Sequence, residues 1–160
     1  MVYLTGVSYP GTLPTSRQQI VQEGETFVPR VLAITRGSTV SFPNADAIFH
    51  NVFSLSSAGA FNLGRYPKGE SRAREFAKPG LVKIFCQIHS HMSATILVLG
   101  HPYFTVPEGA DAAFTLSNVP PGRHTIVGWH ERVGEHAATI EVQAGKTSFI
   151  EMSLPIEDGP

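Results

Sequence analysis

The chain has 160 residues, with 12 Lys and Arg against 13 Asp and Glu, so its formal net charge is −1. A balance this close to zero gives no basic field for nucleic acid or for an anionic membrane surface. No apolar run approaches the roughly 18 residues that a transmembrane helix needs, so no membrane span is expected.

Short apolar or alternating runs, separated by turns rich in Gly and Pro, predict strands along the whole chain. Runs that recur about every ten residues with turn signals between them are typical of β-sandwiches. No segment keeps a 3.6-residue apolar period, so little helix is expected, apart from a short helical turn within residues 58–66. The expected strands are residues 2–7, 17–22, 31–35, 39–42, 48–54, 71–76, 81–85, 94–99, 113–116, 124–129, 137–142 and 147–154.

Between two of these strands lies a motif of potential metal ligands. Cys86 follows the expected strand 81–85, His89 and Met92 come three and six residues later, and His50 lies 36 residues upstream of Cys86. Two His, one Cys and a weak axial Met form the site that favours copper for electron transfer. Zinc normally takes Cys, His and carboxylate ligands, so a thioether in the set argues against it. The motif therefore predicts one copper ion per chain, which cycles between Cu(I) and Cu(II).

Other readings of these residues stay open. A lone Cys or Met is more often a buried core side chain than a ligand, and the joint spacing favours the metal site. His91, directly before Met92, is a possible competing ligand. Neighbouring residues in an extended loop point in different directions, so a solvent-facing His91 is the favoured alternative. Cys86 is the only cysteine, which rules out an intrachain disulfide.

With these motifs, the chain resembles the cupredoxins, the blue-copper proteins of the plastocyanin and amicyanin type. The Cys86 to Met92 spacing is similar to the short amicyanin loop rather than to the longer plastocyanin one. The resemblance implies an all-β Greek-key β-sandwich over residues 17–104. It is carried by residues 27–29, 37–44, 50–52 and 86–92, within a likeness that extends over about residues 18–100.

The same resemblance implies a role for each residue of the site. His50, Cys86 and His89 would be the equatorial copper ligands, and Met92 would be the axial one. Asn51 would hold the two ligand loops together and place a backbone N–H near the Cys86 sulfur, a contact that tunes the metal.

Residues after about 104 form a second β pattern, in which a Pro-Gly turn at 119–122 precedes a strand that carries Trp129. It resembles the small transthyretin-like or carboxypeptidase-regulatory module. We predict that residues 1–16 and 105–160 form this small β-sandwich together, with the copper domain inserted between them. Two domains in series are the alternative. The predicted organisation is similar to exported cupredoxin-like proteins of methylamine-utilisation systems.

A copper centre with four protein ligands leaves no open position for a substrate, which predicts an electron carrier rather than an enzyme. Its partners would be redox proteins, and the electron would pass through the exposed edge of His89. Cys86 lies between Phe85 and Gln87, so it lacks the flanking histidines of a multicopper oxidase.

Two alternatives belong to other functional classes. One is a copper chaperone, store or sensor that binds the metal without redox cycling. The other is a structural β-module that copper merely stabilises. The resemblance to cupredoxins implies the periplasm or another exported location, and we expect that a signal sequence preceded Met1.

Overall fold

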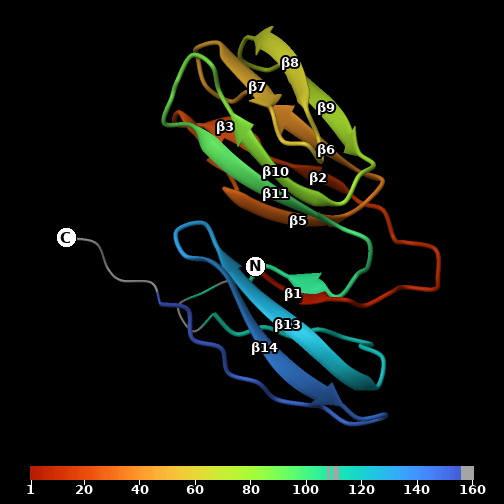
Figure 1. Ribbon diagram of the computed structural model, residues 1–160. Helices are drawn as coiled ribbons and strands as arrows, with labels where there is room; N and C mark the ends of the chain where they lie inside the picture. Colours follow the sequence, from red (N-terminus) through yellow and green to blue (C-terminus); the bar gives the residue numbers. More distant parts are fainter. Residues whose placement is uncertain (108, 110–111, 156–160) are drawn as a thin grey trace. The chain divides into compact units, whose positions relative to one another are not determined.

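A computed structural model describes residues 1–107, 109 and 112–155 (Figure 1). The chain divides into two compact units. We call Tyr9–Pro102 the large unit, and Met1–Ser8 together with Tyr103–Pro160 the small unit.

The described residues form strands and no helix, so the expectation of an all-β chain is confirmed. The prediction of a helical turn within residues 58–66 is wrong, because strand β8 (Phe61–Tyr66) occupies most of that stretch. Among the described residues there is no helix that is long and apolar enough to span a membrane.

The large unit is a sandwich of two sheets. One sheet has the strand order β5-β11-β10-β7-β8, the other has the order β2-β6-β9, and β3 pairs with β4 in a hairpin. The strands of this unit are β2 (Arg17–Gln19), β3 (Val21–Glu23), β4 (Thr26–Val28), β5 (Val31–Thr35), β6 (Ser38–Pro43), β7 (His50–Ser54), β8, β9 (Ser71–Phe76), β10 (Gly80–Phe85) and β11 (Ser93–Leu99).

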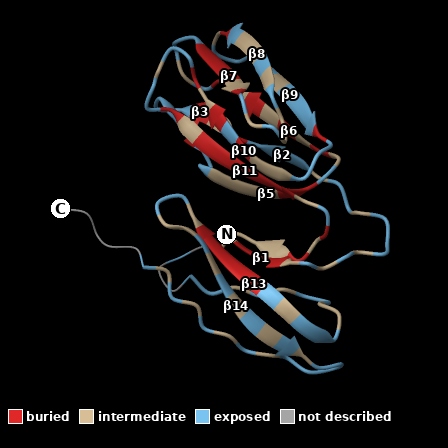
Figure 2. Cartoon of the chain, in the orientation of Figure 1, coloured by how far each residue is buried: buried red, intermediate tan, exposed pale blue. Residues whose placement is uncertain are grey.

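The apolar pattern of the strands explains how the sheets pack. Along β6 every second side chain is buried, as in a strand with one covered face. In β11 residues 94–98 are all buried, which fits its central place between β5 and β10. The core draws on both sheets, as the buried segments in Figure 2 show. Its buried members are Ile20, Phe27, Ile34, Val40, Phe42, Val52, Tyr66, Phe76, Val82, Ile84, Cys86, Met92, Ala94, Ile96 and Val98.

The register of β10 prepares the ligand loop. Its antiparallel pairing with β11 runs from Gly80 opposite Val98 to Phe85 opposite Ser93. Phe85 also pairs with Phe53 of β7. The loop that leaves β10 after Phe85 therefore starts and ends on adjacent strands and lies beside β7.

In the small unit the described residues form one four-stranded sheet with the order β12-β1-β13-β14. Here β1 (Val2–Thr5) lies between β12 (Phe104–Thr105) and β13 (Gly122–His130), and β14 (Gly134–Val142) forms the edge. The strands expected at residues 113–116 and 147–154 are wrong, because the structure shows no strand there.

Candidate metal centre

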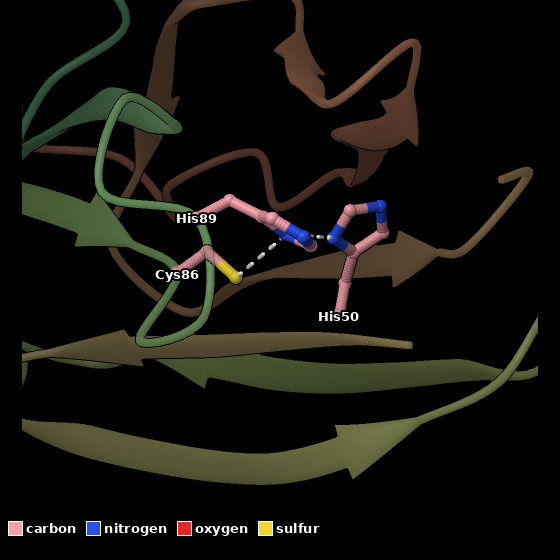
Figure 3. Close-up of side chains that lie close together, drawn as sticks. All are labelled: His50, Cys86 and His89. Carbon is pink, nitrogen blue, oxygen red and sulfur yellow. Dashed lines mark hydrogen bonds between the residues drawn. The ribbon is translucent and has the colours of Figure 1, made fainter. Parts of the chain in front are cut away.

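Three potential ligands come together where β10 ends and β7 begins (Figure 3). Cys86 follows β10 directly and His50 is the first residue of β7. His89 lies in the loop between β10 and β11. One ligand atom from each residue lies within 4.8 Å of the others, which makes this the one such cluster in the described part of the chain.

The loop brings Cys86 and His89 together through its own backbone. The Met92 N–H donates to the His89 carbonyl at 3.0 Å, and the Cys86 N–H donates to the Met92 carbonyl at 3.4 Å. These bonds close the loop between the paired residues Phe85 and Ser93. A loop tied at both ends holds its side chains in one arrangement.

Two of the separations are close to those of ligand atoms that share one metal ion. His50 Nδ1 lies 3.0 Å from His89 Nδ1, and His89 Nδ1 lies 3.8 Å from Cys86 Sγ. Ligand atoms about 2.0–2.3 Å from one ion lie roughly 3.3–3.8 Å apart at tetrahedral to trigonal angles. The nitrogen–sulfur separation lies in this range, and the two imidazole nitrogens are closer together, so they would move slightly apart to bind an ion. Two imidazole nitrogens and a thiolate are donors that suit copper. The cluster is therefore suited to one copper ion.

The side chains of the three potential ligands are buried to different extents. His50 is fully buried and Cys86 is 4% exposed, whereas His89 is half-buried. An ion held here would be shielded from water on the Cys86 side, and the His89 imidazole would be its link to the surface.

Met92 is buried in the core of the large unit, at the end of the ligand loop. It leads directly into β11, which pairs with the strand that ends before Cys86. Met92 therefore lies on the buried side of the loop, and its role as axial ligand stays a prediction.

Asn51 links the two segments that carry the histidines. Its Oδ1 accepts a hydrogen bond from the Gln87 N–H at 3.3 Å, and its Nδ2 donates to Asn62 Oδ1 at 2.8 Å. The buried amide thus ties β7 to both the ligand loop and β8. Its effect on a bound metal stays a prediction.

His91 lies outside the cluster. Its side chain is 60% exposed and its Nε2 lies 3.6 Å from Glu25 Oε2. Its ring centroid is 6.1 Å from that of His89. This placement favours the solvent-facing alternative over a competing ligand.

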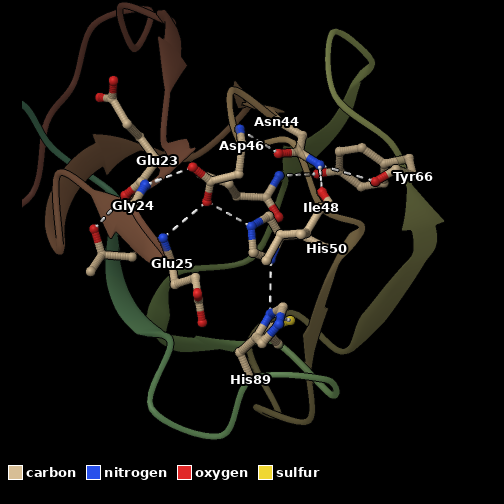
Figure 4. A network of polar contacts seen from close by, with 12 residues as sticks. Glu23, Gly24, Glu25, Asn44, Asp46, Ile48, His50, Tyr66 and His89 are labelled. Carbon is tan, nitrogen blue, oxygen red and sulfur yellow. Dashed lines mark hydrogen bonds and ion pairs between the residues drawn. The ribbon is translucent and has the colours of Figure 1, made fainter.

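Sequence reasoning missed Asp46. Its Oδ2 lies 2.8 Å from His50 Nε2, and the carboxylate also accepts the N–H groups of Gly24 and Glu25 (Figure 4). Burial alone would raise the pKa of this carboxyl, but the bonds from Glu25, His50 and Gly24 hold the pKa below its ordinary value. Asp46 is therefore a carboxylate at neutral pH. An acidic residue four positions before a candidate ligand was the signal available in the sequence.

No family model matches the chain. No curated protein matches it either. Among solved structures, the chain is similar to a reduced mutant of amicyanin, with 20% identity, a TM-score of 0.48, and coverage of 51% of this chain and 80% of that one. A purple cupredoxin from Nitrosopumilus maritimus has 25% identity, a TM-score of 0.46, and coverage of 51% of this chain and 98% of that one.

A third structure is the copper-containing nitrite reductase from Thermus scotoductus SA-01, with 28% identity and a TM-score of 0.48. The match covers 59% of this chain but only 24% of that enzyme. The TM-scores of these three structures all lie below 0.5.

Proposed function

We propose that this chain is a copper protein that carries single electrons between exported redox partners. One copper ion would be held by His50, Cys86 and His89, with Met92 as its axial ligand. The observation that carries the proposal is the convergence of two imidazole nitrogens and one sulfur, with separations of 3.0 and 3.8 Å.

Electron transfer follows from how such a site would be enclosed. Four protein ligands leave no open position for a substrate, and the copper would gain or lose an electron without exchanging a ligand. The ligand loop is tied to paired strands on both sides, and His50 lies in a strand. A pocket held this firmly limits rearrangement between the two oxidation states.

The surface near His89 suits a transient partner. Ile48, Phe49 and Ile88 are large exposed apolar residues, and each lies within two positions of His50 or His89 in the sequence. We propose that they form the docking surface and that the electron leaves through the His89 imidazole. A small contact of this kind suits rapid association and release.

Voltammetry and absorption spectroscopy of the copper-loaded protein test the function. The proposal predicts an intense visible thiolate-to-Cu(II) band and a reversible one-electron wave. A protein that binds only Cu(I), stays colourless and yields its metal to competing ligands would be a chaperone or store instead. Collapse of the fold on copper removal, with no redox wave, would indicate a structural metal.

We also propose that the large unit is the copper domain and that the small unit is a transthyretin-like module. The proposed location is the periplasm or another exported compartment. Fractionation of the source cells checks the location, and recovery of the protein in the cytoplasmic fraction would contradict it.

Replacing Met92 by Gln is expected to retain copper and lower its reduction potential. An amide oxygen is a harder donor than a thioether, so it favours Cu(II) over Cu(I), and the axial ligand tunes the potential. Each tenfold change in the relative affinity for the two states shifts the potential by about 59 mV. Voltammetry of the variant measures the shift. An unchanged potential would show that Met92 is not an axial ligand.

A further inference from the structure

The carboxylate of Asp46 lies on the side of His50 that faces away from the cluster. His50 Nδ1 is 3.0 Å from His89 Nδ1, while His50 Nε2 is 2.8 Å from Asp46 Oδ2 (Figure 4). A carboxylate only accepts hydrogen bonds, so Nε2 carries the proton. Nδ1 then carries the lone pair, which in the metal-free protein accepts a hydrogen bond from His89 Nδ1–H and would be available to a bound metal.

The β3–β4 turn is built to hold this carboxylate. Gly24 N–H donates to Asp46 Oδ1 at 2.7 Å, and Glu25 N–H donates to Oδ2 at 2.9 Å. Both turn residues have positive φ, 61° at Gly24 and 54° at Glu25. A left-handed conformation is unfavourable for a non-glycine residue such as Glu25, and the bond to Asp46 offsets part of that cost.

A second set of bonds fixes the chain around Asp46. The Asp46 N–H donates to Asn44 Oδ1 at 2.9 Å. The Nδ2 of the buried Asn44 donates to the carbonyls of Ile48 at 2.8 Å and Tyr66 at 3.1 Å. The Asp46 side chain is itself only 16% exposed, and His50 is fully buried. Water and salt screen a pair in this position less than they screen surface charges.

We propose that Asp46 is a positioning residue of the metal centre, which fixes the Nε2–H form of His50 and strengthens its Nδ1 as a donor to Cu(II). The inference rests on the proposed function, since it assumes a copper ion between His50, Cys86 and His89. A histidine ligand that donates its other N–H to a carboxylate is held in one orientation and becomes more basic. A more basic nitrogen stabilises Cu(II) more than Cu(I), so Asp46 lowers the reduction potential.

Asp46→Asn and Asp46→Ala test the role, with Glu23→Gln as the control. Glu23 ends β3, next to the same turn, and its loss removes an equal charge without touching a ligand. We expect the Asp46 variants to bind Cu(II) roughly tenfold more weakly relative to Cu(I), at the lower end of such effects. That change raises the potential by about 59 mV, and the control keeps the wild-type value. Equal potentials in all four proteins would overturn the proposal.

Nuclear magnetic resonance of the metal-free protein gives a readout that needs no copper. The unaltered protein should show His50 in the Nε2–H form, with a slowly exchanging Nε2 proton. In Asp46→Ala this proton should exchange faster while the rest of the spectrum keeps its folded dispersion. An Nδ1–H form of His50 in the unaltered protein would refute the role assigned to Asp46.

The two proposals fail in different ways. If the unaltered protein shows no thiolate-to-Cu(II) band and no redox wave, the electron-carrier function fails. If the band and wave are present but the Asp46 variants keep the wild-type potential and His50 proton exchange, only the role of Asp46 fails.

Discussion

Replacing Cys86 by Ser is expected to abolish the intense visible absorption of the Cu(II)-loaded protein. The thiolate is the chromophore in the proposed site and the strongest of its ligands, and a serine hydroxyl supplies neither property. Cys86 is the only cysteine, so no other thiolate in the chain can replace it. Absorption and electron-spin-resonance spectra of the variant, titrated with Cu(II), measure the effect.

His91→Ala is the matched control for this experiment. His91 belongs to the same loop but is largely exposed and lies outside the cluster. Its variant should keep the position and intensity of the band nearly unchanged. Persistence of the band in Cys86→Ser would show that copper binds elsewhere, and a large change in His91→Ala would make His91 a ligand.

Phe42→Ala should give a large loss of stability in the large unit. Phe42 is fully buried in the core between the two sheets, with its ring centroid 6.3 Å from that of Phe61. Removing a buried phenyl ring loses its transfer free energy and leaves a cavity, which lowers the free energy of unfolding by about 3–5 kcal/mol. Urea denaturation of the metal-free protein, followed by circular dichroism, measures the difference.

Phe49→Ala makes the same substitution at the surface. Phe49 is 57% exposed, so its truncation should change the free energy of unfolding by no more than about 0.5 kcal/mol. It should instead weaken association with a redox partner, because Phe49 belongs to the proposed docking surface. Equal losses of stability in the two variants would contradict the burial that the structure assigns to these residues.

Several strands of the sandwich, including two at sheet edges, could be predicted closely from the sequence. The expected strands at residues 31–35 and 71–76 coincide with β5 and β9. In contrast, the sequence predicts no strand at residues 61–66, where Asn62, Gly64 and Arg65 interrupt the apolar pattern. The ladder of β8 with β7, from His50 opposite Tyr66 to Ser54 opposite Phe61, stabilises an extended conformation that local propensity does not indicate.

In the small unit the sequence predicts a strand that the structure does not show. Alternating apolar residues at 147–154 predicted a strand, but alternation shows only which side chains face inward. A strand also needs a neighbouring backbone at the right register. Met152 and Leu154 do approach Gly128 of β13, each within 3.5 Å of the position that a Cβ would take there, although their segment forms no strand.

The metal centre was visible in the sequence as far as ligand types and spacing define it. Cys86 and His89 share a short loop, and the structure brings His50 beside them from β7. Asp46 could not be assigned in the same way. Its position depends on the β3–β4 turn, whose two N–H groups come from more than twenty residues upstream.

X-ray absorption spectroscopy of the copper-loaded protein tests the central claim most directly, because it counts the atoms bound to the metal. With one copper per chain, the site should show one short bond to sulfur and two bonds to imidazole nitrogens, and the sulfur bond should vanish in Cys86→Ser. A copper ion surrounded only by nitrogen and oxygen in the unaltered protein would contradict the proposed site and the electron-carrier function that depends on it.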